Sequence, residues 1–232
     1  HTLQSSHSRA SGRGSPLHSL GAGDNAVARP ETIDFYYAIG SRYSYLAASQ
    51  IDSLEKDTGC QVRWYPLNSR TLIQLRGNDP FNGAAPSGQY EWPYREVDSK
   101  RWAQLYGIPF LEPRNRVAFD SEQLALAATA AKRLGRVREF SHILFSAMFA
   151  EEDVTRIDRE ECISRAARCA LPRDRFEAEL DDPATADEHV ATVQQAHRGG
   201  AFGVPTFVVN GAVFWGNDRL PLLRHHLSRR SS

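Results

Sequence analysis

The chain has 232 residues, of which 41% are hydrophobic and 24% charged, the profile of a globular protein long enough for one large domain or for a domain with an insertion. Its 28 Lys and Arg residues equal its 28 Asp and Glu residues, which argues against a basic surface for nucleic acid or for an anionic membrane. The apolar run LALAATAA at 124–131 is far too short to span a membrane.

Cysteine use and the first residues bear on compartment. Cys60, Cys162 and Cys169 form an odd, widely spaced set, so we expect reduced structural thiols, a cytoplasmic location and no metal site. Residues 1–30 are rich in His, Ser, Gly and Arg and lack the apolar segment of a secretory signal. They are predicted to be a disordered extension, with a transit peptide as the alternative interpretation of their Arg and Ser content.

The stretch after this extension predicts a parallel βαβ unit. Apolar residues alternate along 33–39, which is typical of a buried strand. A helix is expected from Tyr43 to Lys56 with Gly59 as its C-cap, and CQVRWYPL at 60–67 indicates a second strand. Two strands joined by a helix within so short a stretch are expected to pair in parallel.

The middle of the chain is different in character. Residues 68–92 contain many Gly, Asn, Pro and Ser residues and predict a long irregular connection. From Tyr94 to about His197 every pattern is helical, and Asp120 with Gln123 resembles a capping box that begins the helix SEQLALAATAAKRL.

The last segment predicts a hairpin followed by a helix. The apolar runs PTFVV and AVFW are joined by Asn210-Gly211, a strong hairpin signal because both residues tolerate positive φ. The final helix is expected to have Asn217 or Asp218 as its N-cap.

These elements together predict an α/β fold with a thioredoxin-like core. A βαβ half at 31–67 and an αββα half at 196–232 would share one sheet, and the loop and helical domain at 68–195 would be inserted between them.

Two places in such a core are expected to form the site. Ser41-Arg42-Tyr43-Ser44 follows the first strand at a helix N-terminus, where redox members of this fold carry two cysteines. Val204-Pro205-Thr206 begins the hairpin, and Pro205 is expected to be cis. Hydroxyl groups do not exchange disulfides, but beside free helix N–H groups they can hold a thiolate that belongs to another molecule. Glutathione is the expected donor of that sulfur.

The sequence also resembles a known family. DFYYAIGSRYSYLA at 34–47, YREVDSKRWAQLYGIPF at 94–110 and GAFGVPTFVVNGAVFWGNDRL at 200–220 are similar to 2-hydroxychromene-2-carboxylate isomerases and to the related kappa-class glutathione transferases, which belong to the DsbA-like branch of the thioredoxin superfamily. The resemblance runs from about residue 31 to 230.

The resemblance implies roles for particular residues. Ser41 would hydrogen-bond the glutathione sulfur, and Val204, before Pro205, would pair its backbone with the cysteinyl part. Asn217 and Asp218 would hold the γ-glutamyl end. It further implies a homodimer, with glutathione as cofactor and a small aromatic carboxylate as substrate.

The sequence departs from the family pattern at two points. Arg42 stands where the motif has proline, and no lysine occurs between Lys56 and Lys100, where the family usually has one for the glycyl carboxylate. Arg70 or Arg76 is a possible substitute for that lysine.

Several residues also have structural interpretations that sequence leaves open. Ser41, Ser44 and Asp218 are all candidates for helix capping instead of catalysis or ligand binding. Arg42, Tyr43, Ser44 and Trp215 are further candidates for contact with glutathione. Arg42 either faces solvent or contacts an anionic substrate. Tyr36, Tyr37 and Trp215 are expected to be core or pocket wall.

We therefore expect a glutathione-dependent isomerase in aromatic-compound metabolism. The alternatives are a glutathione transferase or peroxidase-like activity at the same site, and a non-catalytic module whose glutathione site has decayed.

Overall fold

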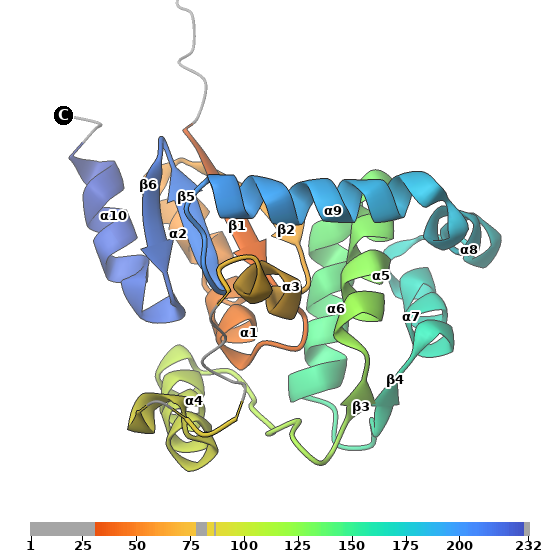
Figure 1. Cartoon of the computed structure of the whole chain (residues 1–232), viewed down its shortest axis with the longest axis horizontal. Coiled ribbons are helices and arrows are strands. Elements are labelled where there is room, and N and C mark those ends of the chain that lie inside the picture. The colour runs from red at the N-terminus through yellow and green to blue at the C-terminus, as the bar shows by residue number, and fades with distance from the viewer. Residues whose placement is uncertain (1–30, 78–82, 86, 230–232) are drawn as a thin grey trace, which may run out of the picture.

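The centre of the molecule is a mixed four-stranded sheet, seen in a computed structural model that describes residues 31–77, 83–85 and 87–229 (Figure 1). The strand order is β2-β1-β5-β6, with β1 and β2 parallel and the pairs β1–β5 and β5–β6 antiparallel. The strands are β1 (Thr32–Tyr37), β2 (Gln61–Pro66), β5 (Thr206–Val209) and β6 (Ala212–Trp215). The predicted thioredoxin-like core is confirmed.

Alternation along β1 gives the sheet two covered faces. Phe35 and Tyr37 point into the larger core, which also contains apolar side chains of the helices on that side. Tyr36 points to the opposite face and packs against Tyr65 of β2. That face is covered by α3 (Ser69–Gln74) and α9 (Pro183–Arg198), which lie in front of the sheet in Figure 1.

The predicted helix after β1 is two helices. α1 (Arg42–Ala48) and α2 (Ile51–Thr58) are separated at Ser49, whose hydroxyl donates to the carbonyl of Leu46 at 2.7 Å. A serine that bonds to the preceding turn competes with the backbone ladder, which accounts for the interruption. The predicted C-cap Gly59 is confirmed, with φ of 67°.

The inserted part of the chain is mainly helical, but the all-helical prediction was wrong in two places. The short strands β3 (Ala118–Phe119) and β4 (Arg156–Ile157) pair in parallel. The helices are α4 (Trp92–Tyr106), α5 (Ser121–Arg133), α6 (Val137–Phe149), α7 (Arg159–Ala166) and α8 (Arg173–Asp181), and a 3₁₀ turn η2 (Ala167–Cys169) follows α7. The helices α5 to α8 form a lobe beside the sheet, called here the helical lobe (Figure 1). The predicted boundaries of core and insertion stay a prediction.

The connection predicted to be irregular contains regular structure. Residues 69–74 form α3, and Gly88–Tyr90 forms the 3₁₀ turn η1, so the prediction for 68–92 was wrong at both ends. The predicted disordered extension at 1–30 and the residues 78–82, 86 and 230–232 lie outside the described residues.

The hairpin prediction is confirmed, but the prediction for the last helix's cap was wrong. Asn210 and Gly211 both have positive φ, 49° and 81°, as the turn between β5 and β6 requires. Residues 217–219 form a 3₁₀ turn, η3 (Asn217–Arg219), and α10 (Leu220–Ser228) begins only after it, without a side-chain cap. Neither predicted residue therefore caps α10.

A buried histidine joins the helical lobe and α9 to the end of the sheet. His189 of α9 accepts a hydrogen bond at Nε2 from the backbone N–H of Asn68 at 3.2 Å, and its Nδ1 lies 3.2 Å from Glu122 of α5. The Asn68 side-chain amide also donates to Glu122 at 2.7 Å. Because Nε2 accepts, the Nδ1 nitrogen carries the proton and donates to the carboxylate.

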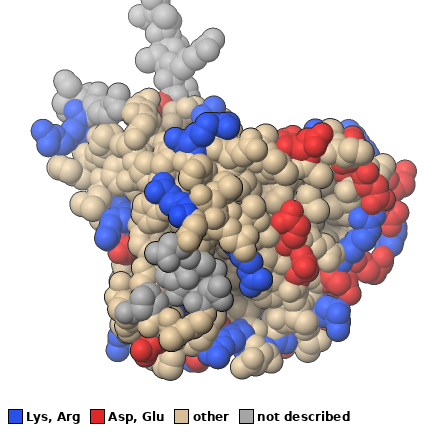
Figure 2. All heavy atoms as spheres, viewed as in Figure 1, with Lys and Arg blue, Asp and Glu red and all other residues tan. Residues whose placement is uncertain are grey.

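Charge is distributed unevenly but without an extended basic surface on the face viewed in Figure 2. Acidic side chains gather around the helical lobe, where Lys and Arg side chains lie among them, and further Lys and Arg side chains are scattered over the rest of that face. Within the described ranges, no helix is long and apolar enough to cross a bilayer. Cys60, Cys162 and Cys169 are free and buried, and burial raises the pKa of each thiol.

Candidate functional site

Ser41 lies at the N-terminus of α1. Its Oγ accepts a hydrogen bond from the backbone N–H of Ser44 at 3.2 Å, so the predicted capping role is confirmed. A serine hydroxyl accepts through oxygen lone pairs and donates through its own hydrogen. Capping therefore leaves the O–H of Ser41 able to donate to a ligand, and a cap and a ligand donor can be the same residue.

Ser44 is structural. Its side chain is fully buried, and its Oγ accepts from the backbone N–H of Ala38 at 3.3 Å. Together with the bond to Ser41, this ties the end of the turn after β1 to the first turn of α1. Of the two serines in the motif, only Ser41 is partly exposed.

The start of the hairpin lies next to the turn after β6. The Val204–Pro205 bond is cis, as predicted, and the N–H of Gly216 donates to the carbonyl of Pro205 at 2.9 Å. Trp215 is 40% exposed and packs on Phe202 with ring centroids 5.2 Å apart. Trp215 is thus a wall residue at the surface and not core.

Asn217 and Asp218 differ in accessibility. Asn217 is buried, and its side-chain N–H donates to the Tyr106 hydroxyl at 3.3 Å, which fixes η3 against α4. Asp218 is exposed and pairs with the adjacent Arg219 at 2.5 Å. Because η3 contacts α1, both residues lie near the helix that Ser41 begins. Asp218 therefore offers a ligand an accessible carboxylate, whereas the Asn217 side chain is enclosed.

Arg42 is buried, so the interpretation that it faces solvent was wrong. It is 5% exposed, and its Nη2 donates to Glu112 Oε1 at 2.9 Å. Its Nη1 is also buried and has no acceptor among the described residues. Desolvation lowers the pKa of Arg42, and Glu112 opposes that shift.

An aromatic ring of α4 gathers further arginines beside Arg42. The guanidinium carbons of Arg42, Arg95 and Arg114 lie 4.9, 4.6 and 4.7 Å from the ring centroid of Trp92. We call these four residues the Trp92 cluster. Stacking on an aromatic face suits the planar guanidinium group, which is more weakly hydrated than an ammonium group.

Tyr43 connects α1 to α4 beside this cluster. Its hydroxyl donates to Asp98 at 2.9 Å, and the guanidinium carbon of Arg95 lies 6.0 Å from its ring centroid. Burial and the Asp98 carboxylate raise the pKa of Tyr43 to about 12, so the phenol keeps its proton at neutral pH.

Sequence reasoning missed the residues of the 112–119 segment that contact the neighbours of Ser41. Phe119 packs on Gly40, and Glu112 binds Arg42, so the residues immediately before and after Ser41 both contact the 112–119 segment. These partners lie more than 60 positions from the motif in sequence, and spacing alone does not identify them.

The two arginines suggested as substitutes for the missing lysine are both exposed on or after α3. Arg76 donates to the carbonyl of Gly200 at 3.4 Å, and its guanidinium carbon lies 5.7 Å from the ring centroid of Phe202. Arg76 is therefore at the edge of the hairpin start, next to the residues that precede Val204.

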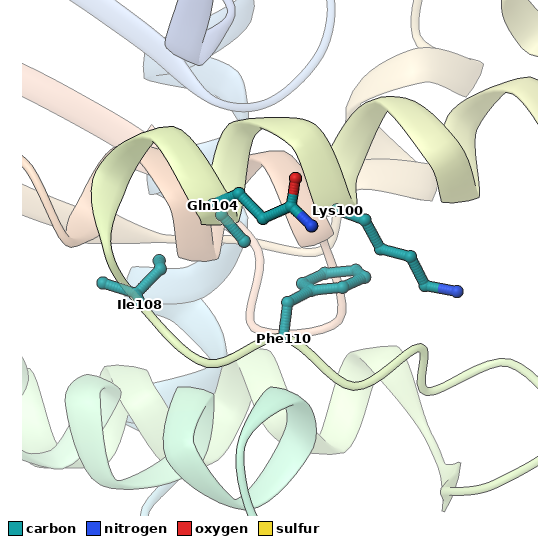
Figure 3. A pocket seen from close by; sticks show the side chains of 5 residues that line it. Lys100, Gln104, Ile108 and Phe110 are labelled. Atoms are coloured by element: carbon teal, nitrogen blue, oxygen red, sulfur yellow. The ribbon is translucent and has the colours of Figure 1, made fainter.

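A separate pocket lies on α4. It has a volume of about 240 Å³ and is lined by Lys100, Ala103, Gln104, Ile108 and Phe110. In Figure 3, Lys100 and Gln104 extend from α4 while the Phe110 ring lies below them, and the Lys100 amine points away from the ring. Ser41 does not line this pocket, so we do not assign the hydroxyl chemistry to it.

Comparison with known proteins agrees with this architecture. Curated 2-hydroxychromene-2-carboxylate isomerases from Pseudomonas putida and Sphingobium xenophagum are 27% and 29% identical to the chain, each over 85% of it and over 94% and 98% of the relative. A solved 2-hydroxychromene-2-carboxylate isomerase is 26% identical with a TM-score of 0.72, covering 86% of this chain and 96% of that one. These relatives support an isomerase.

The fold itself is shared more widely. A probable DsbA oxidoreductase from Streptomyces coelicolor is 19% identical, with a TM-score of 0.67 over 86% of this chain and 89% of that one. The DSBA-like thioredoxin domain matches residues 32–228, which is most of the sequence. The chain therefore belongs to the DSBA-like thioredoxin domain family.

Proposed function

We propose that the protein is a glutathione-dependent isomerase of the 2-hydroxychromene-2-carboxylate isomerase type. The observation that carries the proposal is Ser41, a partly exposed serine at the N-terminus of α1 whose hydroxyl hydrogen is not used in capping. The isomerase names of the similar proteins support the same reaction class.

The reaction interconverts a cyclic chromene carboxylate with an open-chain benzylidenepyruvate, which requires a carbon–carbon double bond to become single for a time. Glutathione, when bound, would supply a thiolate that adds to the conjugated carbon and later leaves, so it would be a cofactor and would not be consumed.

The residues of this chain would keep the sulfur ionised and in place. Ser41 would donate to the thiolate at the positive end of α1. The backbone of Val204 would pair with the cysteinyl unit, and Asp218 would bind the γ-glutamyl ammonium. Buried Asn217 would hold η3 in position through Tyr106. Arg76, at the edge of the hairpin start, is the better placed substitute for the family's lysine.

Two measurements test the proposal. Glutathione titrated into the protein should saturate a change in tryptophan fluorescence, because Trp215 lies beside the hairpin start. Turnover of 2-hydroxychromene-2-carboxylate, followed by the absorbance of the open-chain product, should depend on glutathione. Absence of binding at millimolar glutathione would favour the non-catalytic module, whereas conjugate formation without isomerisation would favour the transferase.

A further inference from the structure

We infer that the Trp92 cluster is a carboxylate-binding subsite that holds the acidic group of the substrate beside Ser41. The inference rests on the proposed function for the identity of that substrate, but its evidence is separate. It concerns Arg42, Arg95, Arg114 and the Trp92 ring on which all three lie; of these residues only Arg42 was considered for an anionic substrate from the sequence.

Arg42 has a buried N–H group that makes no hydrogen bond within the described residues. Its side chain is only 6% exposed, and it makes a single bond to Glu112 through Nη2, while Nη1 is buried and has no acceptor in the described part of the chain. A buried donor without an acceptor costs free energy, and a charged one costs more. An anion that reaches Nη1 would remove that cost.

Three positively charged side chains lie close together in the cluster. Burial lowers the pKa of both Arg95 and Arg42; Arg42 lowers that of Arg95 further, and Arg114 makes a smaller contribution in the same direction at Arg42. Glu112 offsets one of these charges through its bond to Arg42, and its Oε2 is buried without a hydrogen-bond partner in the described residues. Two other nearby acids bond outside the cluster, Glu96 to Lys100 and Asp98 to Tyr43. The Arg114 guanidinium has no ion pair with any residue that the structure describes. Guanidinium groups held close together favour an anionic ligand, and their planar forks match a carboxylate.

The Trp92 cluster lies beside Ser41, because Arg42 directly follows Ser41 at the start of α1. Gly40 and Arg42, on either side of Ser41, both contact the 112–119 segment, and this segment runs from below α1 to β3 in Figure 1. η3 contacts α1, and the N–H of Gly216 before it donates to the carbonyl of Pro205, so the hairpin start also lies near α1. The helix that Ser41 begins therefore borders both the Trp92 cluster and the region proposed for glutathione.

The Trp92 ring explains why the ligand would be aromatic as well as anionic. Trp92 is 40% exposed, so it offers apolar surface to a ligand beside the guanidinium groups that lie on its ring. An aromatic carboxylate would pack on this surface and place its acid among the arginines. The family motif that the sequence resembles has an uncharged proline at position 42, so Arg42 adds a guanidinium group at this point.

The test uses trans-cinnamate as probe and cinnamamide, its neutral analogue of the same shape, as control ligand, with binding measured by calorimetry. Arg114→Gln removes an exposed charge without disturbing an ion pair and should weaken cinnamate by about fivefold, since solvent screens part of the interaction. Arg42→Gln/Glu112→Gln removes a buried pair together and should weaken cinnamate by about tenfold or more. Arg175→Gln, on an exposed turn of α8, is the matched control and should change nothing.

The outcomes separate this inference from the proposed function. Cinnamate binding that depends on the arginines supports the subsite, even if glutathione fails to bind and the proposed function is wrong. No saturable cinnamate binding, equal loss of cinnamate and cinnamamide, or unchanged cinnamate affinity in both variants would each overturn the subsite. Weakened glutathione with unchanged cinnamate would also overturn it, because the cluster would then hold a carboxylate of glutathione.

Discussion

The ring of Phe119 lies directly against Gly40, the residue before Ser41. A Cβ atom at Gly40 would be 2.7 Å from Cε2 of Phe119, closer than side-chain contacts allow. Phe119 is partly exposed, so the ring can move outward if pushed. Glycine at this position therefore sets how closely the 112–119 segment approaches Ser41.

Gly40→Ala should impair turnover more than folding. The displaced ring would shift the wall beside Ser41, while overpacking at a partly exposed ring should cost only about 1 kcal/mol of the free energy of unfolding. Steady-state kinetics and thermal melting measure the two effects. Gly88→Ala is the matched control, because a Cβ there meets nothing within 4 Å. Restored turnover in Gly40→Ala/Phe119→Ala would identify the ring as the cause, and unaltered turnover in the single variant would contradict the prediction.

Ser41→Ala should lower turnover by about 10²-fold and reduce glutathione affinity little, because losing a donor to a thiolate affects the nucleophile more than the binding of the peptide ends. The lost cap should cost about 1 kcal/mol of folding stability. Kinetics and the thiolate absorbance of bound glutathione against pH are the readouts.

Asp158→Ala separates capping from chemistry. Asp158 caps α7 through a bond from the N–H of Glu161 at 3.0 Å, far from the site in sequence and on the helical lobe. Its loss should reduce stability as Ser41→Ala does and leave turnover intact. If Ser41→Ala keeps full turnover and the thiolate signal, Ser41 is only a cap.

Asp218→Ala should weaken glutathione by about tenfold or more, as expected for a charge-assisted hydrogen bond to an ammonium. Its effect on stability should be within about 1 kcal/mol, because Asp218 caps no helix and its pair with Arg219 is exposed. Calorimetry with glutathione and a thermal melt give both values. Asp181→Ala removes a comparable exposed pair, with Arg159, and is expected to leave glutathione affinity unchanged. Equal affinity in the two variants would exclude Asp218 from the site.

Stability should fall as pH decreases below about 6.5 because of His189. Burial lowers its pKa in the folded protein, although Glu122 partly opposes this, so the unfolded chain binds the proton first. Stability then rises with pH across the interval between the folded pKa and the ordinary value of 6.5, by up to about 1.4 kcal/mol per pH unit. Protonation would also place a hydrogen on Nε2, where the Asn68 N–H now donates.

Chemical denaturation from pH 5 to 8 checks the histidine prediction, with the pH limits chosen to bracket about 6.5. His189→Gln should remove this part of the slope, and His225→Gln, at an exposed position of α10, should keep it. The same slope in wild type and His189→Gln would show that other groups cause the pH dependence.

The core was predictable from sequence because its signals are local. Alternation along β1, the Asn210-Gly211 turn and the Gly59 cap each depend on neighbouring residues, and each appears in the structure. The break between α1 and α2 at Ser49 and the 3₁₀ turn at Asn217 were missed. In both places the residues suit a continuous α-helix about as well as the interrupted or 3₁₀ backbone that the structure has.

Only the part of the candidate site formed by Ser41 and the hairpin start was predictable from the sequence. Ser41 and Val204 occupy positions that the fold defines, whereas the burial of Arg42 depends on Glu112, which is 70 residues away. No periodic pattern links such partners, and an arginine in a helix's first turn ordinarily faces water. The contacts that define the Trp92 cluster are of the same long-range kind.

Arg42→Gln should destabilise the protein by about 3 kcal/mol, because it leaves the largely buried Glu112 carboxylate, 14% exposed, without its cation. Glu112→Gln should be comparably harmful, while Arg42→Gln/Glu112→Gln should be much closer to wild type, since two neutral amides can bond to each other. A double-mutant cycle of urea unfolding gives the coupling free energy. Lys100→Gln/Glu96→Gln is the matched cycle at an exposed pair, with an expected coupling below about 1 kcal/mol. A coupling at Arg42 and Glu112 as small as that of the exposed pair would show that the two side chains are solvated in solution, and the buried donor from which the anion subsite was inferred would not exist.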